Sequence, residues 1–315
     1  MTKGNLCIKL KPFTLRRFIS MFAKPGKLML GGNIFGYFTN KEETAQIIRC
    51  AKELGIRAID TADVYSNGIS EEYIGDVIKG EREDWFIATK AGLASYASPR
   101  GLGTRNSLFK KAENSLRRLR VDYIDLYQIH HFDDETPLEE TIEAFDELKR
   151  RGWIRFGGIS NYNVEQVEKI SKYPKSIQYH QAPLNITLSK SSGDFIKANQ
   201  SGNFSVLAYS VLARGLFHEK YLQGTIPCRS RASISLNVRK DLSEEFLKKL
   251  QASFQLCKQY RCSLLAVALH WVCQFETVKW SIIGARNPEQ LREIYQASLT
   301  SLDSSVLQSF ETIWK

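Results

Sequence analysis

The chain has 315 residues, of which 43% are hydrophobic and 25% are charged, as in an ordinary globular protein. Most of its net charge of +10 comes from residues 1–41, which hold eight of the 44 basic residues and none of the 34 acidic ones. Because the rest is nearly neutral, and because it shows neither a long apolar run nor a basic stripe interleaved with aromatic residues, we expect no membrane and no nucleic-acid partner.

Residues 1–26 form a basic extension ahead of the first predicted strand. The segment lacks acidic residues, like an organelle transit peptide, but it is not rich in serine and it contains Pro12. It also lacks the roughly seven-residue apolar core of a secretory signal. Organelle targeting, a cap on the bottom of the fold, and a translation start at Met21 or Met29 are therefore all left open.

The six cysteines show neither C-x-x-C pairs nor zinc-site spacing with the five histidines. In a chain of this size, such a pattern is typical of reduced thiols in an intracellular protein. We therefore expect a cytoplasmic protein without a disulfide framework and without a metal site.

A short apolar run, a turn and a segment of helical period recur along the chain. In chain order, the predicted strands are 27–30, 57–59, 85–89, 124–129, 154–159, 176–180, 205–209 and 280–284. The helical segments that follow them are 42–55, 70–80, 105–120, 138–152, 163–173 and 288–298. The sixth and seventh strands are followed only by "QAPLN" and "SVLARG". Further helices are predicted at 241–260, 263–272 and 303–314.

Continuous apolar strands that alternate with helices indicate a parallel sheet with both faces covered. Eight such units in a chain of this length favour a closed α/β barrel, the (β/α)8 TIM barrel, over an open sheet. We expect a single barrel domain over residues 27–315. Extra helices would lie before its last unit and at its C-terminal end.

Polar side chains stand at or just past the ends of seven predicted strands. They are Asp60, Lys90, His130, Ser160, Gln181, Tyr209 and Arg286. In barrel enzymes, the carboxyl ends of the strands line the active site. These side chains would converge in a closed barrel, whereas an open sheet would spread them along one edge.

Six segments together make the sequence resemble the aldo-keto reductase superfamily. They are "GIRAIDTADVYSNGISEEYIG", "IATK", "DYIDLYQIH", "GGISN", "AYSVLARGL" and "IIGARNPEQLRE". The resemblance runs from about residue 27 to residue 315, and the combination is specific although each segment alone is weak. It implies an oxidoreductase that reduces an aldehyde or ketone to an alcohol with NADPH.

The resemblance implies the catalytic residues Asp60, Tyr65, Lys90 and His130. A carbonyl that accepts a hydride becomes an alkoxide and needs a proton, which Tyr65 would supply as general acid. Free tyrosine, with a pKa of about 10, is a poor donor near neutrality, and a nearby ammonium lowers that pKa. Asp60 would hold Lys90 charged, and His130 would hydrogen-bond the carbonyl oxygen. Relatives that reduce carbon–carbon double bonds have glutamate in place of this histidine, so His130 favours carbonyl reduction.

Each of these residues also has a plainer explanation. Asp60 and Tyr65 could be the cap and the packing residue of an ordinary turn. Lys90 could be a surface lysine, and two adjacent histidines are usually structural. Their occurrence together, each after a separate strand, favours the catalytic interpretation. His130 matches the family position, and we expect His131 to line the pocket mouth.

Neither a G-x-G-x-x-G fingerprint nor a P-loop is present, because Asn33 stands where the second spaced glycine belongs. By resemblance, NADPH lies extended across the barrel mouth instead. The implied contacts are Gly32, Asn33 and Asp60; Ser160, Asn161 and Gln181 at the carboxamide; Tyr209 on the nicotinamide ring; Ser210, Leu212 and Arg214 along the pyrophosphate; and Gly284, Arg286, Gln290 and Glu293 at the adenosine end. The plainer interpretation of "ARNPEQLRE" is a strand-to-helix turn with Pro288 in the first helical turn. A helix N-terminus beside Arg286 nonetheless suits a phosphate.

Three positions depart from the family pattern. Val211 replaces a frequent proline, Leu184 precedes Asn185 where tyrosine is common, and Ile294 replaces an asparagine. The loss of that last amide removes an expected adenine contact. We expect the change to affect cofactor affinity more than nicotinamide geometry.

Substrate choice would depend on the loops 31–40, 92–105 and 218–236. The expected substrate-pocket residues are Phe35, Tyr37, His131 and Phe132. One alternative is a non-enzymatic NADPH-binding regulatory subunit of the potassium-channel beta type, and another is a biosynthetic sugar or polyketide ketoreductase. The complete set of four catalytic residues favours an enzyme acting on a small carbonyl compound, as a monomer or weak homo-oligomer.

Residues 1–24 hold no strand–loop–helix unit, so a chain that lacks them should fold and bind NADPH as the full chain does. Its isoelectric point should also fall toward neutrality. Cofactor titration and thermal unfolding of the truncated chain check this expectation. A truncated chain that fails to fold would show instead that the segment caps the barrel.

Overall fold

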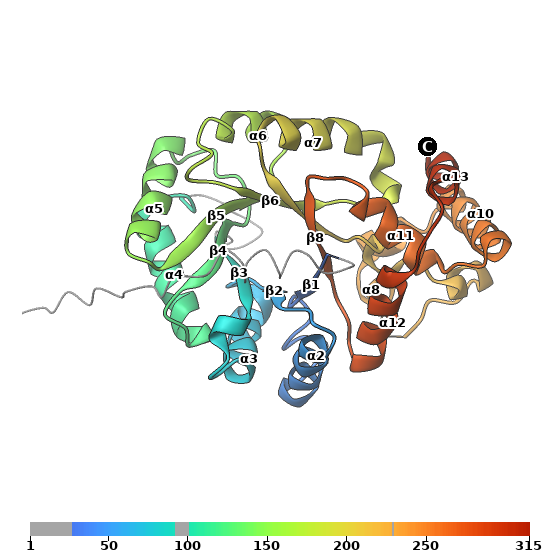
Figure 1. The fold of residues 1–315 in the computed structure, drawn as a ribbon, viewed down its shortest axis with the longest axis horizontal. Helices are drawn as coiled ribbons and strands as arrows, with labels where there is room; N and C mark the ends of the chain where they lie inside the picture. The colour runs from blue at the N-terminus through green and yellow to red at the C-terminus, as the bar shows by residue number, and fades with distance from the viewer. Residues whose placement is uncertain (1–26, 92–100, 229) are drawn as a thin grey trace, which may run out of the picture.

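The computed structural model describes residues 27–91, 101–228 and 230–315, and in these residues eight parallel strands close into a barrel in sequence order (Figure 1). β1 pairs with both β2 and β8, which closes the ring. The strands are β1 (Leu28–Gly31), β2 (Ala58–Asp60), β3 (Phe86–Ala91), β4 (Ile124–Ile129), β5 (Ile154–Ser160), β6 (Tyr179–Pro183), β7 (Ser205–Tyr209) and β8 (Val278–Ile283). The predicted TIM barrel is confirmed.

Large side chains fill the barrel interior near the beginnings of the strands. Phe86, Tyr179 and Trp280 pack there, with the Phe86 and Trp280 ring centroids 4.7 Å apart. Because side chains alternate between the two faces of a strand, Lys90 lies on the same inner face as Phe86, and Gln181 on the same face as Tyr179. The inward-facing side chains are therefore apolar near the beginnings of these strands and polar at their carboxyl ends.

Helices that connect or follow the strands cover the outside of the barrel. They are α2 (Lys41–Glu53), α3 (Ile69–Val77), α4 (Arg105–Leu119), α5 (Leu138–Arg150), α6 (Val164–Ile170), α7 (Ser189–Ser201), α11 (Leu264–Cys273) and α12 (Pro288–Leu299). Side-chain caps define several helix starts: Asn40 and Glu43 form a reciprocal capping box at α2. None of the helices described has the length and apolar character that crossing a membrane requires.

The sequence reading missed helix α7, which follows β6. The inner side of this helix is partly polar, since Ser192 and Asn199 are both buried. The Asn199 side chain bonds the His180 ring of β6 at 2.9 Å. Phe195 also packs against the His180 ring, so the buried face of α7 mixes polar and apolar residues. Such a helix lacks the continuous apolar stripe by which helical period is recognised.

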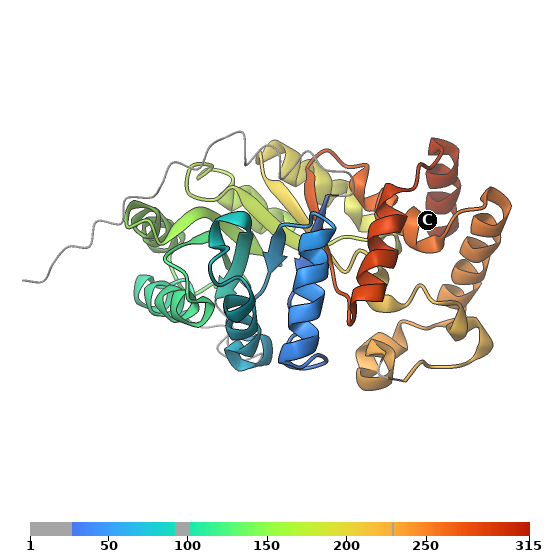
Figure 2. The same cartoon turned by 60° about the horizontal axis from the view of Figure 1, so that its bottom comes forward.

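The extra helices were predicted correctly. α10 (Glu244–Tyr260) precedes α11, and α13 (Ser304–Trp314) follows α12. A long connection between β7 and α10 contains the short helices α8 (Arg231–Ile234) and α9 (Leu236–Lys240). Figure 2 shows α10 and α13 together at one side of the barrel.

Candidate active site

The carboxyl ends of the strands open into a cavity of about 900 Å³. Six of the seven strand-end residues singled out in the sequence line it: Asp60, His130, Ser160, Gln181, Tyr209 and Arg286. The seventh, Lys90, lies beneath the cavity and is fully buried. Barrel closure therefore brings together side chains from seven strands, as the sequence predicts.

Lys90 makes three hydrogen bonds from one ammonium group. Its Nζ donates to Asp60 Oδ2 at 2.7 Å, to the Thr61 carbonyl oxygen at 2.7 Å and to the Tyr65 hydroxyl at 3.3 Å. Burial disfavours the ammonium form, but the Asp60 carboxylate, helped by Tyr65, outweighs burial and raises the pKa of Lys90 above its ordinary value. Lys90 therefore stays charged beside the phenol.

The Asp60 carboxylate uses both of its oxygens. Oδ2 accepts from Lys90, and Oδ1 accepts from Gln181 Nε2 at 2.7 Å. Since a carboxylate can only accept, the amide nitrogen of Gln181 must face Asp60, and its carbonyl oxygen is left for the cavity. Asp60 thus orients Lys90 on one side and Gln181 on the other.

Tyr65 stands in the loop that follows β2, at the start of an unusual turn. Ser66, Asn67 and Gly68 all have positive φ, at 51°, 55° and 91°. Successive left-handed residues are costly when they carry side chains. The Ser66 hydroxyl donates to the Phe35 carbonyl oxygen at 2.8 Å, which ties this turn to the loop after β1. The turn directs the Tyr65 ring toward Lys90 and His130.

His130 lies directly past β4, with its ring edge-on to Tyr65 at a centroid distance of 5.9 Å. Burial, followed by the positive charge of Lys90, lowers the pKa of His130 to about 2. Its ring is therefore neutral at ordinary pH and can donate one hydrogen bond. The ring of His131, which also lines the cavity, stacks on it at 5.3 Å.

Two amide side chains and a phenol form the inner wall. Asn161, held at φ +62°, donates to the His130 carbonyl oxygen at 2.9 Å and to Ser160 Oγ at 3.1 Å. The Tyr209 hydroxyl donates to Asn161 Oδ1 at 2.7 Å. Ser160, Asn161, Gln181 and Tyr209 therefore present amides, a hydroxyl and an aromatic face to one region of the cavity.

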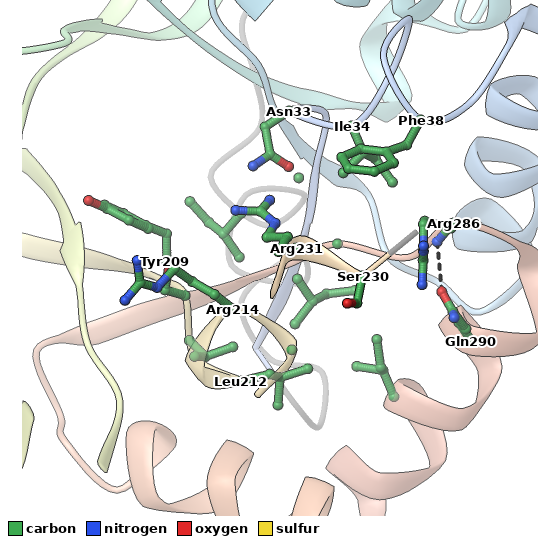
Figure 3. Close-up of a pocket in the computed structure, with 18 of the residues that line it drawn as sticks. Asn33, Ile34, Phe38, Tyr209, Leu212, Arg214, Ser230, Arg231, Arg286 and Gln290 are labelled. Atoms are coloured by element: carbon green, nitrogen blue, oxygen red, sulfur yellow. Dashed lines mark hydrogen bonds between the residues drawn. The ribbon is translucent and has the colours of Figure 1, made fainter. Parts of the chain in front are cut away.

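The other end of the cavity lies at the start of α12. The backbone N–H of Arg286 donates to Gln290 Oε1 at 2.9 Å (Figure 3). Asn287 caps the helix. Gly284 has no neighbour within 4 Å of the position that a Cβ would occupy, so the wall is open there. Glu293 and Ile294 also line this end.

The loop after β7 forms a third wall. Ser210, Leu212 and Arg214 line the cavity, and Arg214 pairs with Asp241. Sequence reasoning missed Arg231, which lies in the middle of the cavity wall between Asn33 and Ser230 (Figure 3). The sequence signal is the basic "CRSRA" stretch within the loop 218–236, which was expected to influence substrate choice. Burial lowers the pKa of Arg231, but its guanidinium stays charged.

Of the residues predicted in the loop after β1, only some line the cavity. Asn33 lines the cavity, whereas Gly32 lies behind it, where a Cβ would meet Ser70 Oγ at 2.9 Å. Phe35 is fully buried in the core, and Tyr37 is 69% exposed.

Phe132 packs edge-on against Tyr162, at a centroid distance of 5.2 Å. In the described part of the chain, the cavity wall uses Ile34 and Phe38 instead of Phe35, Tyr37 and Phe132. Residues 92–100 of the second predicted substrate loop lie outside the described residues.

The departures from the family pattern have visible structural roles. Leu184 is buried, and the neighbouring Asn185, which the family pattern keeps, donates to the Ser210 carbonyl oxygen at 3.1 Å and accepts from Thr187, so it anchors the turn after β7. Val211 is buried beneath that turn. Ile294 contributes an apolar surface to the cavity where an amide was expected.

This constellation at the mouth of an eight-stranded barrel defines the class: the chain belongs to the aldo/keto reductase family, whose family model matches residues 27–315. It is 31% identical to aldo-keto reductase YhdN of Bacillus subtilis, over 91% of this chain and 88% of that protein. It is 26% identical to a probable voltage-gated potassium channel subunit beta of Arabidopsis thaliana, over 84% of each chain.

Among solved structures, the chain is similar to the holo form of aldo-keto reductase AKR11C1 from Bacillus halodurans. The TM-score is 0.74 and the sequence identity is 27%, with 92% of each chain covered. Family membership and these relatives support an oxidoreductase.

Asp60→Leu should leave the Lys90 ammonium buried without its carboxylate. We expect the free energy of unfolding to fall by about 3–5 kcal/mol, the usual cost of breaking a buried ion pair. Adding Lys90→Met removes the stranded charge and should recover most of that loss. Urea unfolding of both variants measures the effect, and simply additive losses would show that the two residues do not act as a pair.

Proposed function

We propose that this protein reduces an aldehyde or ketone to an alcohol, with NADPH as hydride donor and Tyr65 as general acid. The observation that carries the proposal is the position of the Lys90 ammonium, within hydrogen-bonding distance of both Asp60 and the Tyr65 hydroxyl. A buried cation beside a phenol is the arrangement needed to make tyrosine a proton donor near neutrality.

The residues of the cavity fit a nicotinamide dinucleotide. At one end, Ser160, Asn161 and the carbonyl oxygen of Gln181 would hold a carboxamide, and Tyr209 offers a ring face. At the other end, Arg286 and the positive N-terminus of α12 suit a phosphate. The cations Arg214 and Arg231 between them suit a pyrophosphate, so Arg231 joins the proposed cofactor-binding residues. When bound, the cofactor would supply the hydride.

The chain's own residues would handle the proton and the developing charge. The neutral His130 ring would donate a hydrogen bond to the substrate carbonyl oxygen and so orient it. As that oxygen becomes an alkoxide, the Tyr65 hydroxyl would transfer its proton to it. The ammonium of Lys90 would stabilise the phenolate that remains, and Asp60 would keep that ammonium charged and in place.

A binding role without turnover is the alternative from a different class. The similarity to a probable potassium channel subunit beta supports it, because that relative covers most of the chain. The four catalytic side chains lie in bonding or ring contact here, which supports an enzyme more strongly. A biosynthetic ketoreductase would share this mechanism and differ only in substrate. We further propose a cytoplasmic monomer or weak homo-oligomer.

Following NADPH oxidation with a panel of aldehydes and ketones tests the proposal. Turnover with at least one carbonyl compound is expected, and the preferred compounds identify the substrate class. NADPH binding without turnover across the whole panel would favour the regulatory role instead. A wild-type protein that binds no nicotinamide cofactor would overturn both.

Tyr65→Phe removes the proton donor and keeps the ring. Carbonyl reduction should slow by about 100-fold or more, since a positioned general acid contributes about 10²–10⁴ in rate. NADPH affinity should persist, because the adenosine end of the cavity is untouched. Steady-state kinetics and fluorescence titration measure the two effects, and wild-type turnover in this variant would refute the assigned acid.

Arg286→Ala should weaken NADPH binding by about 1.5–3 kcal/mol, the range for a hydrogen bond to a charged group, and should barely change NADH binding. The two cofactors differ by one phosphate, which Arg286 would bind under this proposal. Arg292→Ala is the matched control, because Arg292 is a nearby arginine on α12 that pairs with Glu53 and does not line the cavity in the described residues. Equal losses for NADH and NADPH, measured by fluorescence quenching, would show that Arg286 does not bind that phosphate.

A further inference from the structure

An aromatic cluster joins the last helix to the cavity wall. The Trp314 ring lies 5.2 Å from Phe246, 5.6 Å from Phe217 and 6.5 Å from Phe310 between centroids. Phe217 also lies 6.4 Å from Phe310. Phe217 is the one member of this cluster that also lines the cavity in the described residues, so it connects the two.

Trp314 is held on its far side by a polar contact. Its indole N–H donates to Ser253 Oγ at 3.0 Å, and that hydroxyl in turn donates to the Lys249 carbonyl oxygen of α10. Trp314 is 5% exposed and Ser253 is fully buried. Figures 1 and 2 both show α13 lying against α10, so the indole is fixed to a two-helix support.

Residues 210–217, which end at Phe217, have little regular secondary structure. Ser210, Ala213, Arg214 and Gly215 all have positive φ, between 47° and 83°. Arg214 is exposed, and its partner Asp241 is also on the surface, so their ion pair contributes little rigidity. A turn with this much backbone strain persists only where its surroundings hold it.

We propose that Trp314 is a positioning residue for the cofactor-facing turn 210–217, which it reaches through Phe217. The inference rests on the proposed NADPH binding. By fixing Phe217, the Trp314 ring keeps Arg214 and Leu212 at the cavity wall before the cofactor arrives. Without the ring, the turn would relax in the free protein, and the cofactor would bind more weakly and leave faster. The chemical step, which depends on residues in or just after β2, β3 and β4, would be little changed at saturating cofactor.

The test compares two tryptophans at opposite ends of the barrel. Trp85 is 2% exposed, stands just before β3 and packs against Arg57, so Trp85→Leu should destabilise the fold without touching the cavity. Trp314→Leu should raise the NADPH dissociation constant about tenfold, from the loss of aromatic contacts, mainly through faster release. Its kcat at saturating NADPH should stay within about twofold of wild type. Trp314→Phe, which keeps a ring, should fall between wild type and Trp314→Leu.

Stopped-flow dissociation, equilibrium titration and urea unfolding of wild type and the three variants supply the measurements. A weaker affinity in Trp314→Leu but not in an equally destabilised Trp85→Leu supports the proposal. An unchanged affinity in Trp314→Leu, or the same loss in both variants, overturns it.

If Trp314→Leu does not fold, Phe217→Leu and Trp314→Phe decide the question, and wild-type release rates in both overturn the proposal. Failure of the wild-type protein to bind NADPH would count against the proposed function as a whole. If only the inference about Trp314 is wrong, the wild-type protein still binds NADPH.

Discussion

The buried ion pair between Asp60 and Lys90 is the constraint around which the site is arranged. Taking two charges out of water is costly, and the cost is met only when further polar groups satisfy both partners. Thr61, Tyr65 and Gln181 provide those groups here. The same contacts that make the pair tolerable also aim the phenol and the Gln181 amide, so satisfying the charges and organising the site are one requirement.

Around the ion pair, the alternation of side chains along each strand decides which polar residues at the strand ends point into the barrel. A strand that places Phe86 inside the barrel must also place Lys90 inside it, four residues later. The loops differ in kind, because their conformations depend on contacts with other elements. The left-handed turn after Tyr65 is tied to the Phe35 carbonyl oxygen, and the turn after β7 is tied to the Asn185 side chain.

The strands and the residues at their ends could be predicted because an apolar run, and the alternation of side chains along it, can be recognised from neighbouring residues alone. Helix α7 could not, because its contact with β6 combines the polar pair His180 and Asn199 with the ring of Phe195, and its buried face therefore lacks a continuous apolar stripe. The loop residues were harder still. Whether Phe35 or its neighbour Ile34 faces the cavity is decided by the turn geometry of residues 32–40, and the place of Arg231 is decided by a long connection with no period of its own.

The pairing of β1 with β8 has a consequence for how the protein is made. Residues Leu30 and Ile283 are ladder partners, so the ring cannot close until β8 has left the ribosome. The four side chains proposed for catalysis are complete in sequence by residue 130, yet the closed barrel in which Lys90 is fully buried also needs β8. Contacts of such long range slow folding and leave the β1 edge exposed to other chains in the meantime. During synthesis, the residues proposed for catalysis are thus made before the closed barrel that surrounds them can form.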